Sequence, residues 1–143
     1  MFSPEFAPLA VINVDDTHGR LLADAVASTQ PGHELRVVPV SADQITDVVV
    51  DASSHRYRWR GIDVAVPLGG RFNVANSLAV ITTAVELGID PQLAAEGLRA
   101  ATVVPGRFEV VPSAAGDRRG FTVIVDYAHT PDGLAEVLAS ARA

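Results

Sequence analysis

The sequence predicts an α/β fold, and three observations lead to this prediction. A strand, a helix and a second strand follow one another within residues 9–40, residues 45–68 alternate apolar and polar side chains, and a strand runs directly into a helix near residue 130. A strand, helix and strand in series form the unit of a parallel sheet covered by helices. Alternation with a period of two is typical of antiparallel strands.

The first unit lies in the N-terminal part of the chain. An apolar run at residues 9–14 predicts a buried strand, and apolar side chains at helical spacing predict a helix over residues 17–28. Pro31 and Gly32 interrupt the helical pattern, and residues 34–40 are predicted to be the second strand.

The alternating segment, residues 45–68, predicts two or three antiparallel strands with turns near residue 53 and at Gly61. Tyr57 and Trp59 lie two positions apart and should share one face. The alternate positions carry three arginines, namely Arg56, Arg58 and Arg60. A stacking platform for nucleic acid bases is one interpretation, but we favour an edge hairpin with a solvated basic side.

The clearest helix begins at Arg71 and carries apolar side chains at three and four spacing. Gly88 is placed to end it in a left-handed conformation. Asp90 is predicted to cap a second helix, with Pro91 as its first residue and its end near residue 100.

The C-terminal part begins with a turn or hinge at the Pro-Gly pair of residues 105–106. Two strands, residues 107–111 and 121–126, are expected on either side of a polar turn at residues 114–120. A last helix is predicted over residues 131–143.

Asp126 stands at the carboxyl end of the last predicted strand, which is where ligands bind in open α/β sheets. Thr130 is the expected N-cap of the last helix, and Pro131 its first residue. A carboxylate here suits the hydroxyls of a ribose. On this motif alone, the alternative that Asp126 caps the turn and that His129 is a surface residue stays open.

Asn73 and Asn76 lie three positions apart near the start of the clearest helix, so they project from nearly the same side. An amide offers a donor and an acceptor, which matches the edge of adenine or a phosphate oxygen. Asparagine is mildly unfavourable within helices, so two of them need a reason. For Asn73 alone, we favour a plain N-cap.

A polar cluster follows the first strand and contains Asn13, Asp15, Asp16 and His18. Its carboxylates allow a magnesium site. No second metal-binding motif accompanies the cluster, so we favour a turn in which an aspartate caps the helix. His33 and His55 have no convergent partners in the sequence, and we expect both at the surface.

Composition excludes several classes of function. The net charge of −6 argues against binding of a nucleic acid backbone, which relies on clustered Lys and Arg. The sequence has no cysteine, which excludes disulfides and thiol nucleophiles and fits a cytosolic enzyme. Its apolar runs are shorter than the roughly 20 residues that cross a bilayer. We expect a cytoplasmic protein that binds neither nucleic acid nor membrane.

Four stretches in this order, "VINVDDTHG", "GRFNVANSLAV", "VPGRFEVV" and "VDYAHTPDGL", resemble the Mur ligases. The last stretch is similar to the members that add the third residue of the peptidoglycan stem peptide, rather than to those that act before or after them. The resemblance extends over essentially the whole chain.

The resemblance implies an organisation in two parts. Residues 1–105 would be the C-terminal part of the central, ATPase domain, and residues 106–143 would be the first strands and helix of a Rossmann-like C-terminal domain. The P-loop lysine, carbamylated lysine, magnesium ligands and amino-acid-binding motif of the family have no counterpart here. The chain is therefore expected to be a fragment that is inactive alone.

The resemblance also implies a reaction, in which ATP with Mg²⁺ converts a carboxylate of UDP-N-acetylmuramoyl dipeptide into an acyl phosphate. A free amino acid, lysine or diaminopimelate, then attacks it. Asn76, with Asn73 beside it, matches asparagines that contact ATP, and Arg107 matches a linker arginine that reaches the phosphates as the candidate catalytic residue. Asp126 matches an aspartate that holds the ribose, and His129 belongs to the same motif without an assigned step.

Two other functions remain open from the sequence. One is a non-catalytic module that binds a nucleotide or another protein. The other is part of a ligase similar to the folylpolyglutamate synthetases, against which the "DYAH" sequence weighs.

Overall fold

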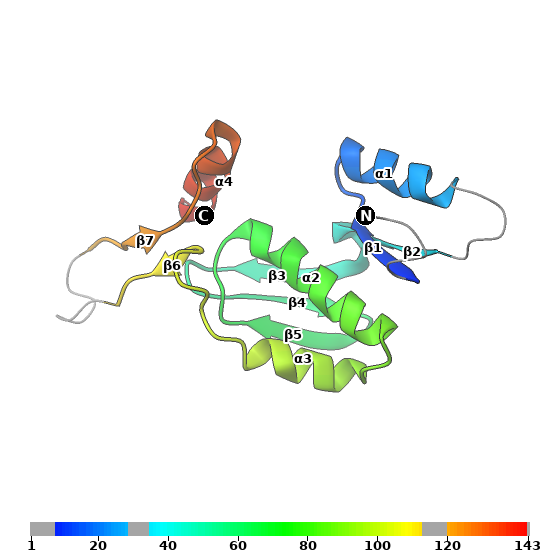
Figure 1. Cartoon of the computed structure of the whole chain (residues 1–143). Helices are drawn as coiled ribbons and strands as arrows, with labels where there is room; N and C mark the ends of the chain where they lie inside the picture. Colours follow the sequence, from blue (N-terminus) through cyan, green and yellow to red (C-terminus); the bar gives the residue numbers. More distant parts are fainter. Residues whose placement is uncertain (1–7, 29–34, 113–119, 143) are drawn as a thin grey trace.

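The computed structural model describes residues 8–28, 35–112 and 120–142 (Figure 1). Helices and strands alternate along the chain, so the predicted α/β class is confirmed. Three small sheets are present in the described part of the chain, and the longest helix lies beside the largest of them (Figure 1).

The N-terminal unit is the predicted strand, helix and strand. Strands β1 (Leu9–Asn13) and β2 (Arg36–Val40) pair in parallel, and helix α1 (Thr17–Ala27) connects them in sequence. Ala10 and Ile12 of β1 are buried with Val26 of α1 in a small core of their own.

The middle unit is a three-stranded antiparallel sheet in the order β3-β4-β5, which follows a short 3₁₀ helix, η1 (Ala42–Gln44). Its strands are β3 (Ile45–Val50), β4 (His55–Trp59) and β5 (Ile62–Val66). This agrees with the predicted antiparallel strands.

The predicted edge hairpin is wrong, because β4 is the central strand of this sheet. Tyr57 and Trp59 share a face as predicted, but that face is the core, where they are 2% and 1% exposed. Buried rings cannot form a platform for nucleic acid bases. Arg56 and Arg58, on the opposite face of β4, are exposed. Arg60 lies in the turn after β4, and its guanidinium carbon is 4.5 Å from the centroid of the Trp59 ring.

Helices α2 (Arg71–Glu86) and α3 (Pro91–Arg99) cover the buried face of this sheet. Gly88 has the predicted left-handed conformation after α2, with a φ of 92°. Asp90 caps α3 through hydrogen bonds from two backbone amides, as predicted. The main core unites both layers and contains Val40, Ile45, Tyr57, Trp59, Val64, Val66, Val74, Leu78, Ile81 and Ala95.

The C-terminal unit consists of strands β6 (Glu109–Val110) and β7 (Ile124–Val125), which pair antiparallel, and helix α4 (Pro131–Ala141). Both strands are shorter than predicted. Phe108 has a positive φ of 46°, which interrupts the extended backbone before β6. Phe121 and Val123 are 65% and 41% exposed, because no further strand of the described chain covers them. Most of the predicted turn at residues 114–120 lies outside the described residues.

Among the described residues, no helix combines the length and the apolar character that a membrane span requires.

Candidate functional site

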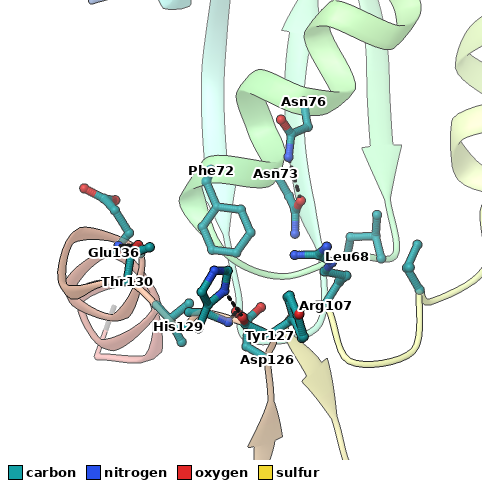
Figure 2. Close-up of a pocket in the computed structure, with 14 residues that line it drawn as sticks. Leu68, Phe72, Asn73, Asn76, Arg107, Asp126, Tyr127, His129, Thr130 and Glu136 are labelled. Carbon is teal, nitrogen blue, oxygen red and sulfur yellow. Dashed lines mark hydrogen bonds between the residues drawn. The ribbon is translucent and has the colours of Figure 1, made fainter.

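The sequence-predicted site residues meet around one cavity of about 660 Å³ (Figure 2). The first turns of α2, the linker after α3 and the segment between β7 and α4 all contribute to its wall. The five predicted residues that line it are Asn73, Asn76, Arg107, Asp126 and His129. Its volume lies in the usual range for small-molecule sites.

Asn73 and Asn76 form the wall on α2. Asn73 is the third residue of the helix, and its Nδ2 donates to Gly69 O at 2.7 Å. Asn76 donates from Nδ2 to Asn73 Oδ1 at 3.2 Å, which links the two amides. The favoured N-cap interpretation of Asn73 is wrong, because the N-cap is Gly70, which has no side chain to cap with. Asn73 instead ties the helix back to the preceding loop.

Arg107 belongs to the linker that follows α3. Its backbone N–H donates to Val104 O at 3.1 Å, which closes a turn around Pro105 and Gly106, as predicted for this pair. The guanidinium is exposed, and its central carbon lies 5.2 Å from the centroid of the Tyr127 ring. No ion pair engages it within the described residues. The side chain therefore offers a free cation at the edge of the cavity.

Asp126 follows β7 directly and accepts two backbone hydrogen bonds. Oδ1 accepts from Ala128 N at 2.7 Å, and Oδ2 accepts from Phe108 N at 2.8 Å. The interpretation of Asp126 as a turn cap is thus confirmed. A carboxylate has about four lone-pair positions, so these two bonds leave acceptor capacity for a hydroxyl in the cavity.

Phe108 connects the linker to α2 through its ring and to Asp126 through its backbone amide. It is 3% exposed, and its ring meets the edge of Phe72 with centroids 5.6 Å apart. Its left-handed backbone is unusual for a bulky residue and persists because the surrounding contacts hold it. Phe72 lines the cavity beside Asn73 but was missed in the sequence, where it reads as one more apolar helix residue.

Tyr127 is the second cavity residue that the sequence analysis missed. It is 66% exposed, and its ring centroid lies 5.2 Å from that of His129. His129 is itself exposed and its Nδ1 lies 3.1 Å from Tyr127 O. The sequence did offer a signal for Tyr127. It is an aromatic residue close to the end of a predicted strand, and it follows Asp126, a candidate ligand-binding residue.

Helix α4 closes the cavity on the third side. Thr130 caps it by accepting from Gly133 N, and Pro131 is its first residue, as predicted. The start of α2 meets this helix, because Arg71 N donates to Ser140 Oγ at 3.3 Å. Ser140 is buried, and the bond satisfies one of the free amides at the N-terminus of α2.

The acidic cluster after β1 is structural, as favoured from the sequence. Asp16 caps α1 by accepting from Gly19 N at 2.7 Å, and this bond holds the pKa of Asp16 below its usual value. Asp15 accepts from Ser41 Oγ at 2.8 Å and from Ala42 N. Nowhere in residues 8–28, 35–112 and 120–142 do three histidine or acidic side chains converge as metal ligands.

The expected surface position of His55 is wrong, because the residue is 2% exposed in the core. Burial lowers the pKa of its imidazole below the usual 6.5. Its neighbour Tyr57 has a raised pKa for the same reason. His33, the other histidine assigned to the surface, lies outside the described residues.

Several curated relatives of the chain carry the same name. A UDP-N-acetylmuramoyl-L-alanyl-D-glutamate--2,6-diaminopimelate ligase of Streptomyces coelicolor is 37% identical over 149 aligned residues, which cover 99% of this chain and 28% of the relative. Ligases with the same name from Gloeobacter violaceus and Geobacter metallireducens are 39% and 41% identical and are covered over 29% and 25% of their lengths. The chain thus spans about a quarter to three tenths of these relatives, as expected for part of a longer ligase.

Solved structures also resemble the chain. A UDP-N-acetylmuramoyl-L-alanyl-D-glutamate--2,6-diaminopimelate ligase matches with a TM-score of 0.66 at 31% identity, over 94% of this chain and 28% of the other. MurF from Acinetobacter baumannii matches with a TM-score of 0.71 at 20% identity, over 92% of this chain and 29% of the other, which supports the fold alone. No protein-family model matches the chain.

Proposed function

Because this chain belongs to the Mur ligase family, we propose that it forms the nucleotide-binding part of an ATP-dependent ligase of peptidoglycan synthesis. The cavity is the observation that carries the proposal. Amide, guanidinium and carboxylate groups from three separate segments line it, namely Asn73, Asn76, Arg107 and Asp126. This set of donors and acceptors matches the base, phosphates and ribose of a nucleotide.

The substrates that we propose follow the names of the relatives. These ligases are named for UDP-N-acetylmuramoyl-L-alanyl-D-glutamate and 2,6-diaminopimelate, so we favour diaminopimelate over lysine as the third residue of the stem peptide. ATP would supply the phosphoryl group that activates the substrate carboxylate as an acyl phosphate, which the amine then attacks. The chain itself would bind and orient the nucleotide.

Each wall of the cavity has a separate role in this proposal. Asn76 presents its amide to the base, with Asn73 holding it in place through the 3.2 Å bond between them. Arg107 pairs with phosphate oxygens through its planar fork of donors. Asp126 accepts from ribose hydroxyls, and the exposed Tyr127 ring offers a face on which a base can stack. His129 lines the same cavity and receives no chemical step.

We place no magnesium ion on this chain, because its described acidic residues do not converge. The ion's ligands would belong to the rest of the ligase. We also propose that the turn at Pro105 and Gly106 divides a central-domain part, residues 1–105, from the start of a C-terminal domain, residues 106–143. A ligase that uses UDP-linked precursors of this kind would work in the cytoplasm.

A nucleotide titration tests the site. Backbone amide resonances of the 143-residue chain are followed by NMR as ATP is added. We expect the largest shifts at the first turns of α2, at Arg107 and between Asp126 and Thr130. Asn76→Ala and Arg107→Ala should each weaken the response about tenfold, because each removes a hydrogen-bonding group. Shifts that spread evenly, or that gather away from the cavity, would contradict the site.

A chimera tests the ligase function. The aligned segment of the Streptomyces coelicolor relative is replaced by this chain, and formation of the amide from diaminopimelate is measured. We expect activity that Arg107→Ala abolishes while the melting temperature stays unchanged. The isolated chain should form no amide. A folded chimera that binds ATP but never turns over would instead favour the non-catalytic nucleotide-binding module.

A further inference from the structure

The ring of His55 contacts both ends of the segment that carries the two asparagines. Its Nδ1 lies 2.6 Å from Leu68 O, and its Nε2 lies 2.8 Å from Ser77 Oγ. Leu68 immediately precedes Gly69, whose carbonyl accepts from Asn73. Ser77 immediately follows Asn76 in α2. One imidazole therefore spans the ten residues from the loop to the second turn of the helix.

The contacts fix where the proton of the ring lies. A carbonyl oxygen only accepts, so Nδ1 must carry the proton and donate to Leu68 O. Nε2 is then bare and accepts from the hydroxyl of Ser77. Tyr57 completes the chain, since its hydroxyl lies 3.2 Å from Ser77 Oγ and can donate to it. Ser77 has one hydroxyl proton, for which Val74 O at 3.0 Å and the Tyr57 hydroxyl also compete with Nε2. With that proton on the Nε2 contact and the Tyr57 proton directed to Ser77 Oγ, each ring nitrogen and both hydroxyls are satisfied without an added charge.

The network is buried and lies outside the proposed nucleotide contacts. His55 and Tyr57 are each 2% exposed, and Ser77 is 5% exposed. Burial lowers the pKa of His55, which agrees with a neutral ring. A buried polar network with every member satisfied holds its surroundings in one arrangement. Leu68, by contrast, lines the cavity itself.

We propose that His55 is a positioning residue for the nucleotide site, in which Nδ1 sets the loop that anchors Asn73 and Nε2 sets the helical turn that carries Asn76. This inference rests on the proposed function for its purpose, although the positioning itself can be measured without a nucleotide. A histidine with only a structural role in the core would stabilise the fold, but its two nitrogens would not position Asn73 and Asn76 separately.

Two substitutions test the contacts of the two ring nitrogens one at a time. His55→Asn keeps a donor near the Nδ1 position and loses the contact with Ser77, whereas His55→Gln reaches the Nε2 position and loses the contact with Leu68 O. The readout is the pair of side-chain amide resonances of Asn73 and Asn76 in the chain without ligand. Because the two amides are hydrogen-bonded to each other, each change reaches both residues. We expect His55→Asn to move the Asn76 signals more than those of Asn73, and His55→Gln to do the reverse. Equal movement of both pairs of signals in both variants, or no movement in either, would overturn the proposal.

Two further measurements decide the matter if these variants do not fold. The ring ¹⁵N shifts of wild-type His55 should show a protonated Nδ1 and a bare Nε2, and the opposite tautomer would overturn the proposal. Ser77→Ala, which keeps the imidazole, should move the Asn76 signals more than those of Asn73, and the reverse order would overturn the proposal.

An ATP titration of the same variants separates this proposal from the function itself. We expect each variant to bind ATP about tenfold more weakly than the wild type, as the loss of one aligned hydrogen bond predicts. Variants that keep wild-type affinity despite shifted asparagine signals would overturn the role in the nucleotide site. A wild-type chain that shows no response to ATP, with the asparagine pattern intact, would count against the proposed function alone.

Discussion

The two walls of the cavity are built in different ways. The wall on α2 belongs to the main core, where Leu78 and Ile81 of the same helix are 1% and 0% exposed. The opposite wall, formed by segments of residues 104–112 and 120–137, rests on two strands of two residues each, and Val125 of β7 is 45% exposed. Hydrogen bonds at single points, such as Phe108 N to Asp126 Oδ2, hold it in place.

In the proposed nucleotide site, this difference would separate two tasks. A contact built on a buried helix is held in a fixed geometry, as recognition of a ligand requires. A wall with few buried apolar contacts opens at a lower free energy, as closure around a ligand requires. Three substitutions test the contrast and a pH dependence follows them, beginning with the change that we expect to have the largest effect.

Gly69→Ala should be the most damaging change, because a Cβ at this position would lie 1.9 Å from the carbonyl oxygen of Ala52. The backbone would have to move, and we expect the free energy of unfolding to fall by about 4 kcal/mol in urea denaturation. Gly97→Ala in α3 is the matched control, since its Cβ would meet nothing within 4 Å. It should stabilise the chain by about 0.5 to 1 kcal/mol. Equal effects of the two changes would show that the loop before α2 is not tightly packed.

Leu78→Ala compares the interiors of the two walls. Leu78 is 1% exposed, so its truncation should lower the free energy of unfolding by about 3 kcal/mol through lost burial and a cavity. Leu134 of α4 is 50% exposed, and Leu134→Ala should cost less than about 1 kcal/mol. Denaturation followed by circular dichroism measures both. If Leu134→Ala lowered the free energy of unfolding more than Leu78→Ala, the α4 side and not the α2 side would be the rigid wall.

Asp126→Asn should loosen the linker without unfolding the core. An amide nitrogen cannot accept from Phe108 N, so this variant loses one of the two bonds of the carboxylate, worth about 1 to 2 kcal/mol. Hydrogen exchange at the Phe108 amide should accelerate about tenfold, while exchange in α2 stays unchanged. Asp132→Asn, at the exposed first turn of α4, serves as control. Unchanged exchange at Phe108 would mean that this bond does not hold the wall.

The smallest expected effect is a dependence of stability on pH through His55. Its folded-state pKa is lowered from 6.5 by burial, so the unfolded chain binds the proton more readily. The contribution of the neutral His55 to the free energy of unfolding is fully present above about pH 6.5 and is lost as the pH falls below that value. Asp51, Arg56 and Arg99 line the neighbouring cavity. The Asp51 carboxylate would favour a proton on His55, whereas the two guanidinium groups would oppose it.

Urea denaturation at about pH 7.5 and about pH 5 measures this dependence. His55→Asn has no such group, and its free energy of unfolding should change less between the two pH values. A variant with the full wild-type dependence would assign the effect to another group.

Local chemistry in the sequence predicted most of the elements. Asp16, Asp90 and Thr130 each accept from an amide in the next turn, and a capping residue needs no knowledge of distant contacts. The first strand, helix and strand were predicted for the same reason. The four-stretch resemblance brought Asn76 and Arg107 together although the linker and α2 are far apart in sequence.

The errors concern residues whose environment is set by distant partners. His55 was expected at the surface because its partner Ser77 lies 22 positions away, on another element. Asn73 was assigned as a cap because the start of α2 at Gly70 leaves no polar side chain to mark it. Strands β6 and β7 were predicted too long because their length depends on sheet neighbours, which the local pattern does not report.

The left-handed residue just before β6 sets the direction in which the chain leaves the linker. A left-handed backbone costs a bulky residue about 1 to 2 kcal/mol, whereas burying its ring gains about 1.5 to 3 kcal/mol. Phe108 holds this conformation with 3% of its surface exposed, so the aromatic ring outweighs the backbone. One side chain, packed against Phe72 of α2, thus sets the direction in which the backbone enters β6.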